Sequence, residues 1–248
     1  TLKVNTTGHT NTAIGVGSLK TNSEGFRNTG VGLDSLRLNT TGYQNTAVGS
    51  FALDQNTTAA NNTAIGHSAL NANTTGIANV AVGANALDAN TTGESIVAIG
   101  KDALGANTTG VSNVAVGKGA LATATVANNN TAVGTHALNA STTAVQNVAV
   151  GTFAADAITT GNDNAVLGTY ALGVCTTGTG NIAIGTSSLG ANTTASNNTA
   201  VGRAAMTANT TGSQNVAVGS FALEGNTASN NTAVADQAMR VNTTGGNN

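Results

Sequence analysis

The segment NTTGYQNTAVGSFALDQ, from Asn39 to Gln55, is one unit of a repeat that runs through the whole chain. When its residues are numbered one to seventeen, position eleven is a glycine that recurs thirteen times at intervals of seventeen: Gly15, Gly32, Gly49, Gly66, Gly83, Gly100, Gly117, Gly134, Gly151, Gly168, Gly185, Gly202 and Gly219. A fourteenth copy follows at Ala235, sixteen residues on. A fixed period of this length is typical of a solenoid, in which each repeat forms one coil stacked on the last.

This period predicts an all-β fold, a parallel β-solenoid (β-roll or β-helix) of about 14 coils. Because the repeat is continuous, we expect one β-solenoid domain over residues 1–248. The chain starts at Thr1, without Met, and ends at position seven of an unfinished repeat, where a coil would leave its stacking surface exposed. We therefore expect the sequence to be a fragment of a longer chain, with caps and anchor outside it.

Positions eight to ten are the clearest strand signal in the repeat. Position ten is Val, Ile or Leu in every copy, position eight is Thr, Val, Ile or Ala, and position nine is Ala in all but two copies. Alternate residues of a strand share a face, so the branched residues point one way and the alanines the other. Two orientations are open: either the branched face lines the coil and the alanines meet a neighbouring chain, or the reverse. We take the first as the prediction.

Five further columns are constrained. Position fourteen is Ala or Ser and position fifteen is mostly Leu, which predicts a second short strand after the turn at the position-eleven glycine. Asn at positions one and seven and Thr at position two predict side-chain ladders that bond the turn backbone of adjacent coils.

An alanine stripe exposed along the chain would be a contiguous apolar surface, which a partner subunit would cover. The sequence therefore predicts self-association, as a homo-oligomer or a filament. The predicted interface consists of the position-nine alanines, which include Ala47, Ala64, Ala81, Ala98, Ala115, Ala132 and Ala149.

Composition excludes several other partners. The net charge is -2 and only 7% of residues are charged, so no basic surface for nucleic acid is expected. No run of about 18 apolar residues is present, so no membrane insertion is expected in this segment. Cys175 is the one cysteine, which rules out an internal disulfide.

No pattern of residues indicates catalysis. His9, His67 and His136 lie in separate coils, without a second ligand at metal-binding spacing, and no Gly-rich phosphate loop occurs. A carbohydrate-cleaving enzyme would need a cluster of acidic residues, which the sequence lacks. We therefore expect no enzyme activity, no cofactor and no metal.

Several aromatic residues share one column. Phe51, Phe153, Tyr170 and Phe221 all occupy position thirteen and are candidate surface-binding residues for a receptor or glycan. The alternative is that these rings pack on the neighbouring coil.

The segments NTAVGSFAL (Asn45 to Leu53) and NVAVGANAL (Asn79 to Leu87) resemble the head repeats of trimeric autotransporter adhesins, and are similar to repeats of phage tail fibres. That resemblance implies a left-handed β-roll, three chains side by side, binding to host surfaces, and a location outside the cell, on a cell surface or on a virion. This chain differs in having seventeen residues per coil, where the family has about fourteen.

The leading functional prediction is a structural fibre or adhesin segment, a rigid rod that assembles side by side or end to end and presents a repeated surface for attachment. The alternative is an ice-binding (antifreeze) solenoid with a Thr ladder. Against ice binding, the adjacent Thr residues of NTTG point to opposite faces and leave one outward Thr file. The native mass discriminates: a trimer favours the adhesin or tail fibre, a polymer favours a filament, and a monomer favours ice binding.

Overall fold

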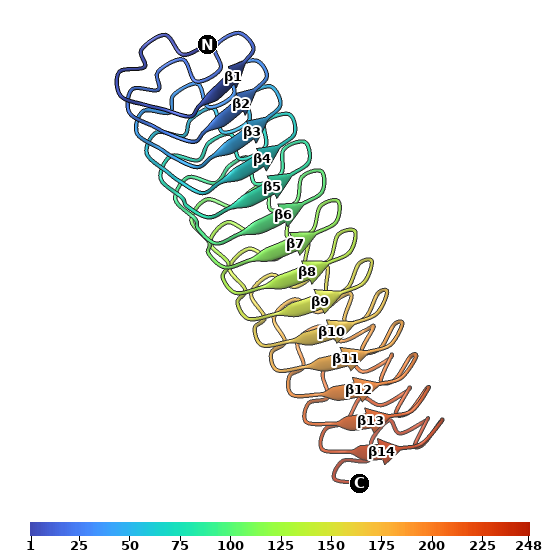
Figure 1. The fold of residues 1–248 in the computed structure, drawn as a ribbon. Helices are drawn as coiled ribbons and strands as arrows, with labels where there is room; N and C mark the ends of the chain where they lie inside the picture. The colour runs from blue at the N-terminus through green and yellow to red at the C-terminus, as the bar shows by residue number, and fades with distance from the viewer. The chain divides into compact units, whose positions relative to one another are not determined.

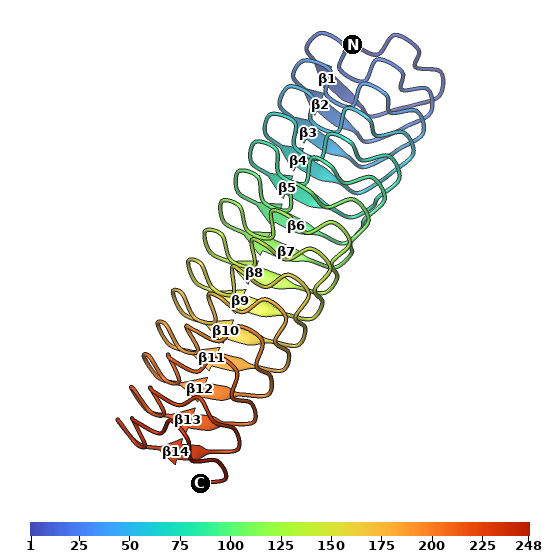
Figure 2. The ribbon, with the colours of Figure 1, turned by 180° about the vertical axis from the view of Figure 1, so that it is seen from behind.

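The computed structural model describes residues 1–248, which form two compact units, residues 1–126 and 127–248. Each unit is a stack of coils that contribute one three-residue strand each (Figures 1 and 2). The first unit holds β1 (Thr12–Ile14), β2 (Thr29–Val31), β3 (Thr46–Val48), β4 (Thr63–Ile65), β5 (Val80–Val82), β6 (Val97–Ile99) and β7 (Val114–Val116). The second holds β8 (Thr131–Val133), β9 (Val148–Val150), β10 (Ala165–Leu167), β11 (Ile182–Ile184), β12 (Thr199–Val201), β13 (Val216–Val218) and β14 (Thr232–Val234).

The predicted all-β parallel solenoid with a seventeen-residue repeat is confirmed. Within each unit, consecutive strands pair in parallel with equivalent positions opposite each other, as in Thr46 opposite Thr63. The shorter last copy keeps this register, with Val216 opposite Thr232. The residue missing from that copy is therefore absorbed in the loop between Asn226 and Asn231, outside the strand.

The second strand predicted at positions fourteen and fifteen is absent, and that prediction is wrong. This segment is a run of turns in which positions thirteen and fifteen have positive φ, 62° at Phe51 and 51° at Leu53. In a strand, consecutive side chains would point to opposite faces. Here the left-handed residue turns its side chain back, so Ala52 and Leu53 are both fully buried in the coil.

The face of the strand that points into the coil is the alanine face, opposite to our prediction. In β3 the alanine of position nine, Ala47, is fully buried, whereas Thr46 is partly exposed and Val48 exposed. A buried alanine recurs at this position in the other strands except β1, where Ala13 is partly exposed, and β2 and β10, which hold the buried Gly30 and Val166. The alanine column thus lines the inside of the coil and the branched columns form its outer face.

The narrowness of the coil explains this orientation. Gly30 occupies position nine of its coil, and a Cβ placed there would lie 2.6 Å from Oγ of Ser18 and 3.1 Å from Oγ of Ser35, both at position fourteen. The strand and the wall opposite it are therefore separated by about the width of two small side chains. At Gly30, where the wall carries two serines, a Cβ would require a shift of the wall. Alanine occupies position nine in most other coils, and the larger Val166 is buried at this position in β10.

Buried asparagines at position seven join neighbouring coils. Oδ1 of Asn45 accepts the backbone N–H of Asn62 at 3.0 Å, and Nδ2 of Asn45 donates to the carbonyl of Ala59 at 2.8 Å. Asn45 is fully buried, so these bonds satisfy backbone groups that water cannot reach. The column repeats this pair of bonds in successive coils of both units, as at Asn164 with Asn181 and Gly178.

Asparagines at position one form a second ladder. In the first unit, Nδ2 of Asn39 donates to Oδ1 of Asn22 at 2.7 Å and to the carbonyl of Gly42 at 3.0 Å. The threonine that follows adds a third contact, because Oγ1 of Thr40 donates to the carbonyl of Thr57 at 3.0 Å. The predicted Asn and Thr ladders are thus present, and they bond turn backbone between coils.

The position-eleven glycines are required by the backbone. Gly66 has a φ of 138°, a backbone conformation that residues with a Cβ rarely adopt. A Cβ on Gly66 would also lie 2.5 Å from the carbonyl oxygen of Gly83 in the next coil. Strain and collision act together here, so we expect Gly66→Ala to destabilise the fold by at least about 2 kcal/mol. Thermal unfolding followed by circular dichroism measures the change.

The matched control is Gly105→Ala. A Cβ on Gly105 would have its nearest neighbours at 3.4 Å or more, an ordinary packing distance, and this residue has no positive φ. This substitution is expected to be neutral or to stabilise by less than about 1 kcal/mol. Equal losses in both variants would contradict the constraint assigned to position eleven.

The position-one ladder of the first unit ends at a buried polar atom. Oδ1 of Asn107 is buried without a hydrogen-bond donor, and the residue in the next coil that would supply one is Ala124. We expect Ala124→Asn to donate to Asn107 and to stabilise the protein by about 1 kcal/mol, the usual net value of a hydrogen bond. Ala122→Asn, at a column that already holds asparagine, should stay within about 0.5 kcal/mol, and a lower melting temperature for Ala124→Asn would overturn the assignment.

Candidate interaction surfaces

The outer face of the strands, formed by positions eight and ten, is the most regular surface of each unit. We call it the strand face. Its branched side chains are substantially exposed, with Ile65 at 41% and Ile99 at 39% in the first unit and Val148 at 45% in the second. Because the strands pair in register, these residues form two straight files along each unit.

The strand face carries no charge. Every residue at positions eight and ten is Thr, Val, Ile, Ala or Leu, while charged residues lie at other positions of the repeat. A contiguous exposed apolar surface of this kind usually marks an interaction site. The sequence pattern identified these columns, but our prediction placed them inside the coil. Neither face of the strand carries charge, and the alternation of residues along the strand does not say which face is buried.

The alanines predicted as the oligomer interface cannot form one. Each of them is completely inaccessible within one chain, inside its own coil, so a partner subunit cannot touch them: Ala47, Ala64, Ala81, Ala98, Ala115, Ala132 and Ala149. Position nine faces the interior of the coil, where most coils place alanine and β10 places Val166.

The predicted surface-binding aromatics lie against their neighbours in the stack. Phe51 makes an edge contact with His67, with ring centroids 5.9 Å apart. Phe153 is sandwiched between His136 and Tyr170. Tyr170 is the last ring of that stack and is 52% exposed.

The fourth of these residues, Phe221, has cations on its ring. The guanidinium carbon of Arg203 lies 4.4 Å from its ring centroid, and that of Arg240 lies 5.5 Å away. Cation–π contacts at exposed sites contribute about 0.5–1 kcal/mol each. Phe221 therefore already has partners within its own unit.

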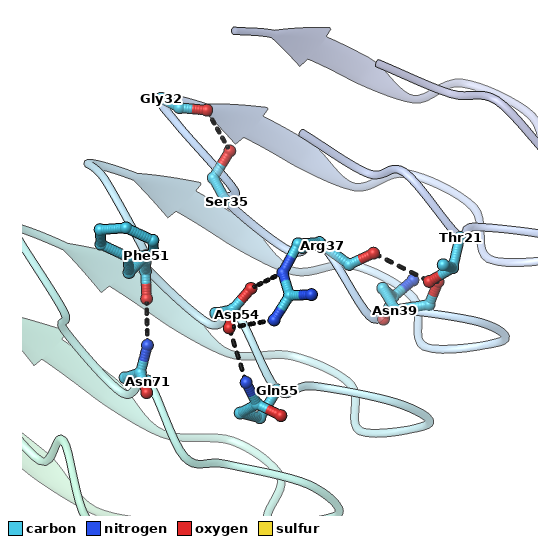
Figure 3. A network of polar contacts seen from close by, with 9 residues as sticks. All are labelled: Thr21, Gly32, Ser35, Arg37, Asn39, Phe51, Asp54, Gln55 and Asn71. Atoms are coloured by element: carbon cyan, nitrogen blue, oxygen red, sulfur yellow. Dashed lines mark hydrogen bonds and ion pairs between the residues drawn. The ribbon is translucent and has the colours of Figure 1, made fainter. Parts of the chain in front are cut away.

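Charged side chains of adjacent coils are also paired along a column (Figure 3). Nε of Arg37 donates to Oδ1 of Asp54 at 2.6 Å and Nη2 donates to Oδ2 at 2.8 Å, while Gln55 donates to the same carboxylate at 2.6 Å. The hydrogen bond to Asp54 raises the pKa of Arg37 further. This bidentate contact joins two coils and occupies both oxygens of the Asp54 carboxylate.

A shallow groove of about 520 Å³ lies beside Tyr170 in the second unit, and Asp156 and Thr207 line it. Burial raises the pKa of Asp156, against hydrogen bonding to its own backbone and the charge of His136. The sequence signal that could have located this groove is a pair of glycines, Gly173 and Gly190, in consecutive copies of position sixteen.

Other titratable groups do not gather into a site. No group of three or more His, Cys, Asp or Glu residues is placed to hold a metal ion. Burial raises the pKa of the Cys175 thiol, which stays protonated at neutral pH inside the coil. No helix with the length and apolarity needed to cross a bilayer is found.

Asp88 gives a pH-dependent prediction. Burial, aided by the negative charge of Asp102, raises the pKa of Asp88 above its usual 3.8. The folded state therefore favours the protonated carboxyl, so the stability that Asp88 contributes is present below pH 3.8 and is lost as the pH rises through the raised pKa.

We expect Asp88→Asn, which mimics the protonated form, to raise the melting temperature at pH 7 and to have little effect at pH 3. The gain should stay below about 1 kcal/mol, because solvent screens a half-exposed carboxyl. Melting curves of both proteins over this pH range provide the measurement. A difference that is constant across the range, or larger in acid, would refute the prediction.

Comparison of the chain with protein-family models, with curated proteins and with solved structures finds no match.

Proposed function

We propose that this chain is a structural segment of an extracellular or virion-borne fibre or adhesin, which assembles with copies of itself through the strand face. One observation carries the proposal: two uncharged files of branched side chains run in register along each unit and are exposed to solvent. Association would remove this apolar surface from water, at about 25 cal/mol per Å² buried.

The construction of the coil supports a rigid element. Buried Asn bonds, paired charges and stacked rings all join one coil to the next, so each coil is held at several points around its circumference. The resemblance of the NTAVGSFAL segment to adhesin head repeats supports a location outside the cell and an assembly of three chains. Such a role needs no catalytic residue and no cofactor.

The test replaces exposed branched residues with lysine. We expect the double variant Ile65→Lys, Ile99→Lys to fold normally and to associate at least tenfold more weakly, because two charges would have to be desolvated in the interface. Light scattering and analytical ultracentrifugation measure the assembly, and circular dichroism confirms the fold.

The control variant is Thr58→Lys, Thr92→Lys, at position three, which is exposed and holds Glu24 in another coil. These lysines lie outside the strand face and should leave assembly unchanged. A wild-type protein that stays monomeric at high concentration, or equal assembly in both double variants, would reject the strand face as an interface.

Ice binding is a second candidate, favoured by the geometry of the same face. The strand face presents two outward files at regular spacing, and Thr occupies position eight in half of the copies, including Thr46 and Thr63. Thr occurs in only one of the two files, so the strand face, like the NTTG segment, presents a single Thr file. Thermal hysteresis in the wild type that Ile65→Lys abolishes would favour this function, and its absence would exclude it.

A further inference from the structure

The groove beside Tyr170 is a local departure from the repeat. In the position-thirteen column, His136, Phe153 and Tyr170 stack with centroids 5.5 and 5.2 Å apart, and the next residue is Ser187. One face of the Tyr170 ring is covered by Phe153, but the column offers no ring for the other face. A bare aromatic face is thus left at the end of the stack.

The neighbouring column opens the space in front of that face. Position sixteen holds Asp54, Asn71 and the single Gly105 in the first unit, but two consecutive glycines here, Gly173 in the coil of Tyr170 and Gly190 in the next coil. Neither glycine has a positive φ, so the conformation of the backbone does not require glycine at either position. A Cβ would lie 3.3 Å from the carbonyl oxygen of Tyr170 on Gly173 and 3.1 Å from that of Ser187 on Gly190. The absence of both side chains leaves the groove of about 520 Å³.

Polar groups line the two ends of the hollow. Oδ1 of Asp156 lies 3.5 Å from the point where a Cβ of Gly173 would stand, so the carboxylate borders the empty space. At the other end, Oγ1 of Thr207 donates to the carbonyl of Ser187 at 2.7 Å, which leaves the lone pairs of that hydroxyl available as acceptors. Val174, 46% exposed, adds an apolar edge.

We propose that this groove binds one pyranose ring of a glycan, with the C–H face of the sugar on Tyr170 and its hydroxyls donating to Asp156 and Thr207. A flat aromatic face next to a carboxylate matches a ligand that is apolar on its ring face and carries hydroxyl donors at its rim. An anion is disfavoured by Asp156, and an extended apolar peptide by the polar ends of the groove. The binding does not depend on assembly through the strand face.

The test titrates the whole chain with three sugars, cellobiose, methyl β-galactopyranoside and diacetylchitobiose, followed by NMR of the Tyr170 ring and by calorimetry. A single open groove should bind weakly, with a Kd on the order of 1 mM for at least one of them. Tyr170→Ala should weaken that binding at least tenfold, and Asp156→Asn should weaken it severalfold. No saturation with any of the three up to about 50 mM would overturn the proposal.

Gly173→Asn tests the groove without removing the ring. At the equivalent position of the first unit, Nδ2 of Asn71 donates to the carbonyl of Phe51 at 2.9 Å, so this side chain fits the coil and would fill the hollow. We expect it to abolish binding at an unchanged melting temperature. Phe51→Ala, in the same column as Tyr170 but in the other unit, should bind as the wild type does, and binding retained in Gly173→Asn would disprove the site.

Discussion

The structure depends on the hydrogen bonds that buried asparagines make between neighbouring coils. Only three residues of each seventeen lie in a strand, but backbone N–H groups outside it also donate to carbonyls of neighbouring coils, as Phe51 does to Leu33 and Leu53 does to Ala69. The N–H of Asn62 is bonded instead by the side chain of Asn45, which satisfies a buried backbone donor. The amide of Asn45 accepts from the backbone of one residue of the next coil and donates to the backbone of another. This double contact fixes the distance and the register between coils, and the strands pair in the register it allows.

The asparagines explain how a chain with few large apolar residues can form a solenoid. In most coils the interior holds one alanine from the strand, one alanine or serine from the opposite wall and one leucine. Such a small core contributes little apolar burial per coil, and the repeated amide bonds supplement it. Where the column is interrupted, as at Ala124, the preceding Asn107 keeps a buried oxygen without a donor.

The surface of the coils consists of columns that are uniform along the repeat and columns that vary from coil to coil. The strand face is uniform because every coil contributes two uncharged residues, of which all but Ala165 are branched. The columns at positions thirteen and sixteen vary from coil to coil, and their variation produces local features: an ion pair at Arg37, a stack of rings at Phe153 and a groove at Gly173. A repeat scaffold can thus vary in single coils while its strand face stays constant.

The sequence by itself determined the period, the parallel all-β solenoid, the strand at positions eight to ten and the asparagine ladders, because each follows from residues that recur at one spacing. It did not determine which face of the strand is buried, since alternation separates two faces without saying which one fits inside. Only the tertiary structure decided this, through the close approach of the wall that carries Ser18 and Ser35 to the strand at Gly30. The same limit applies to Leu53, whose left-handed backbone directs it inward without a strand, and to the groove at Tyr170, which exists because residues seventeen apart lie side by side in adjacent coils.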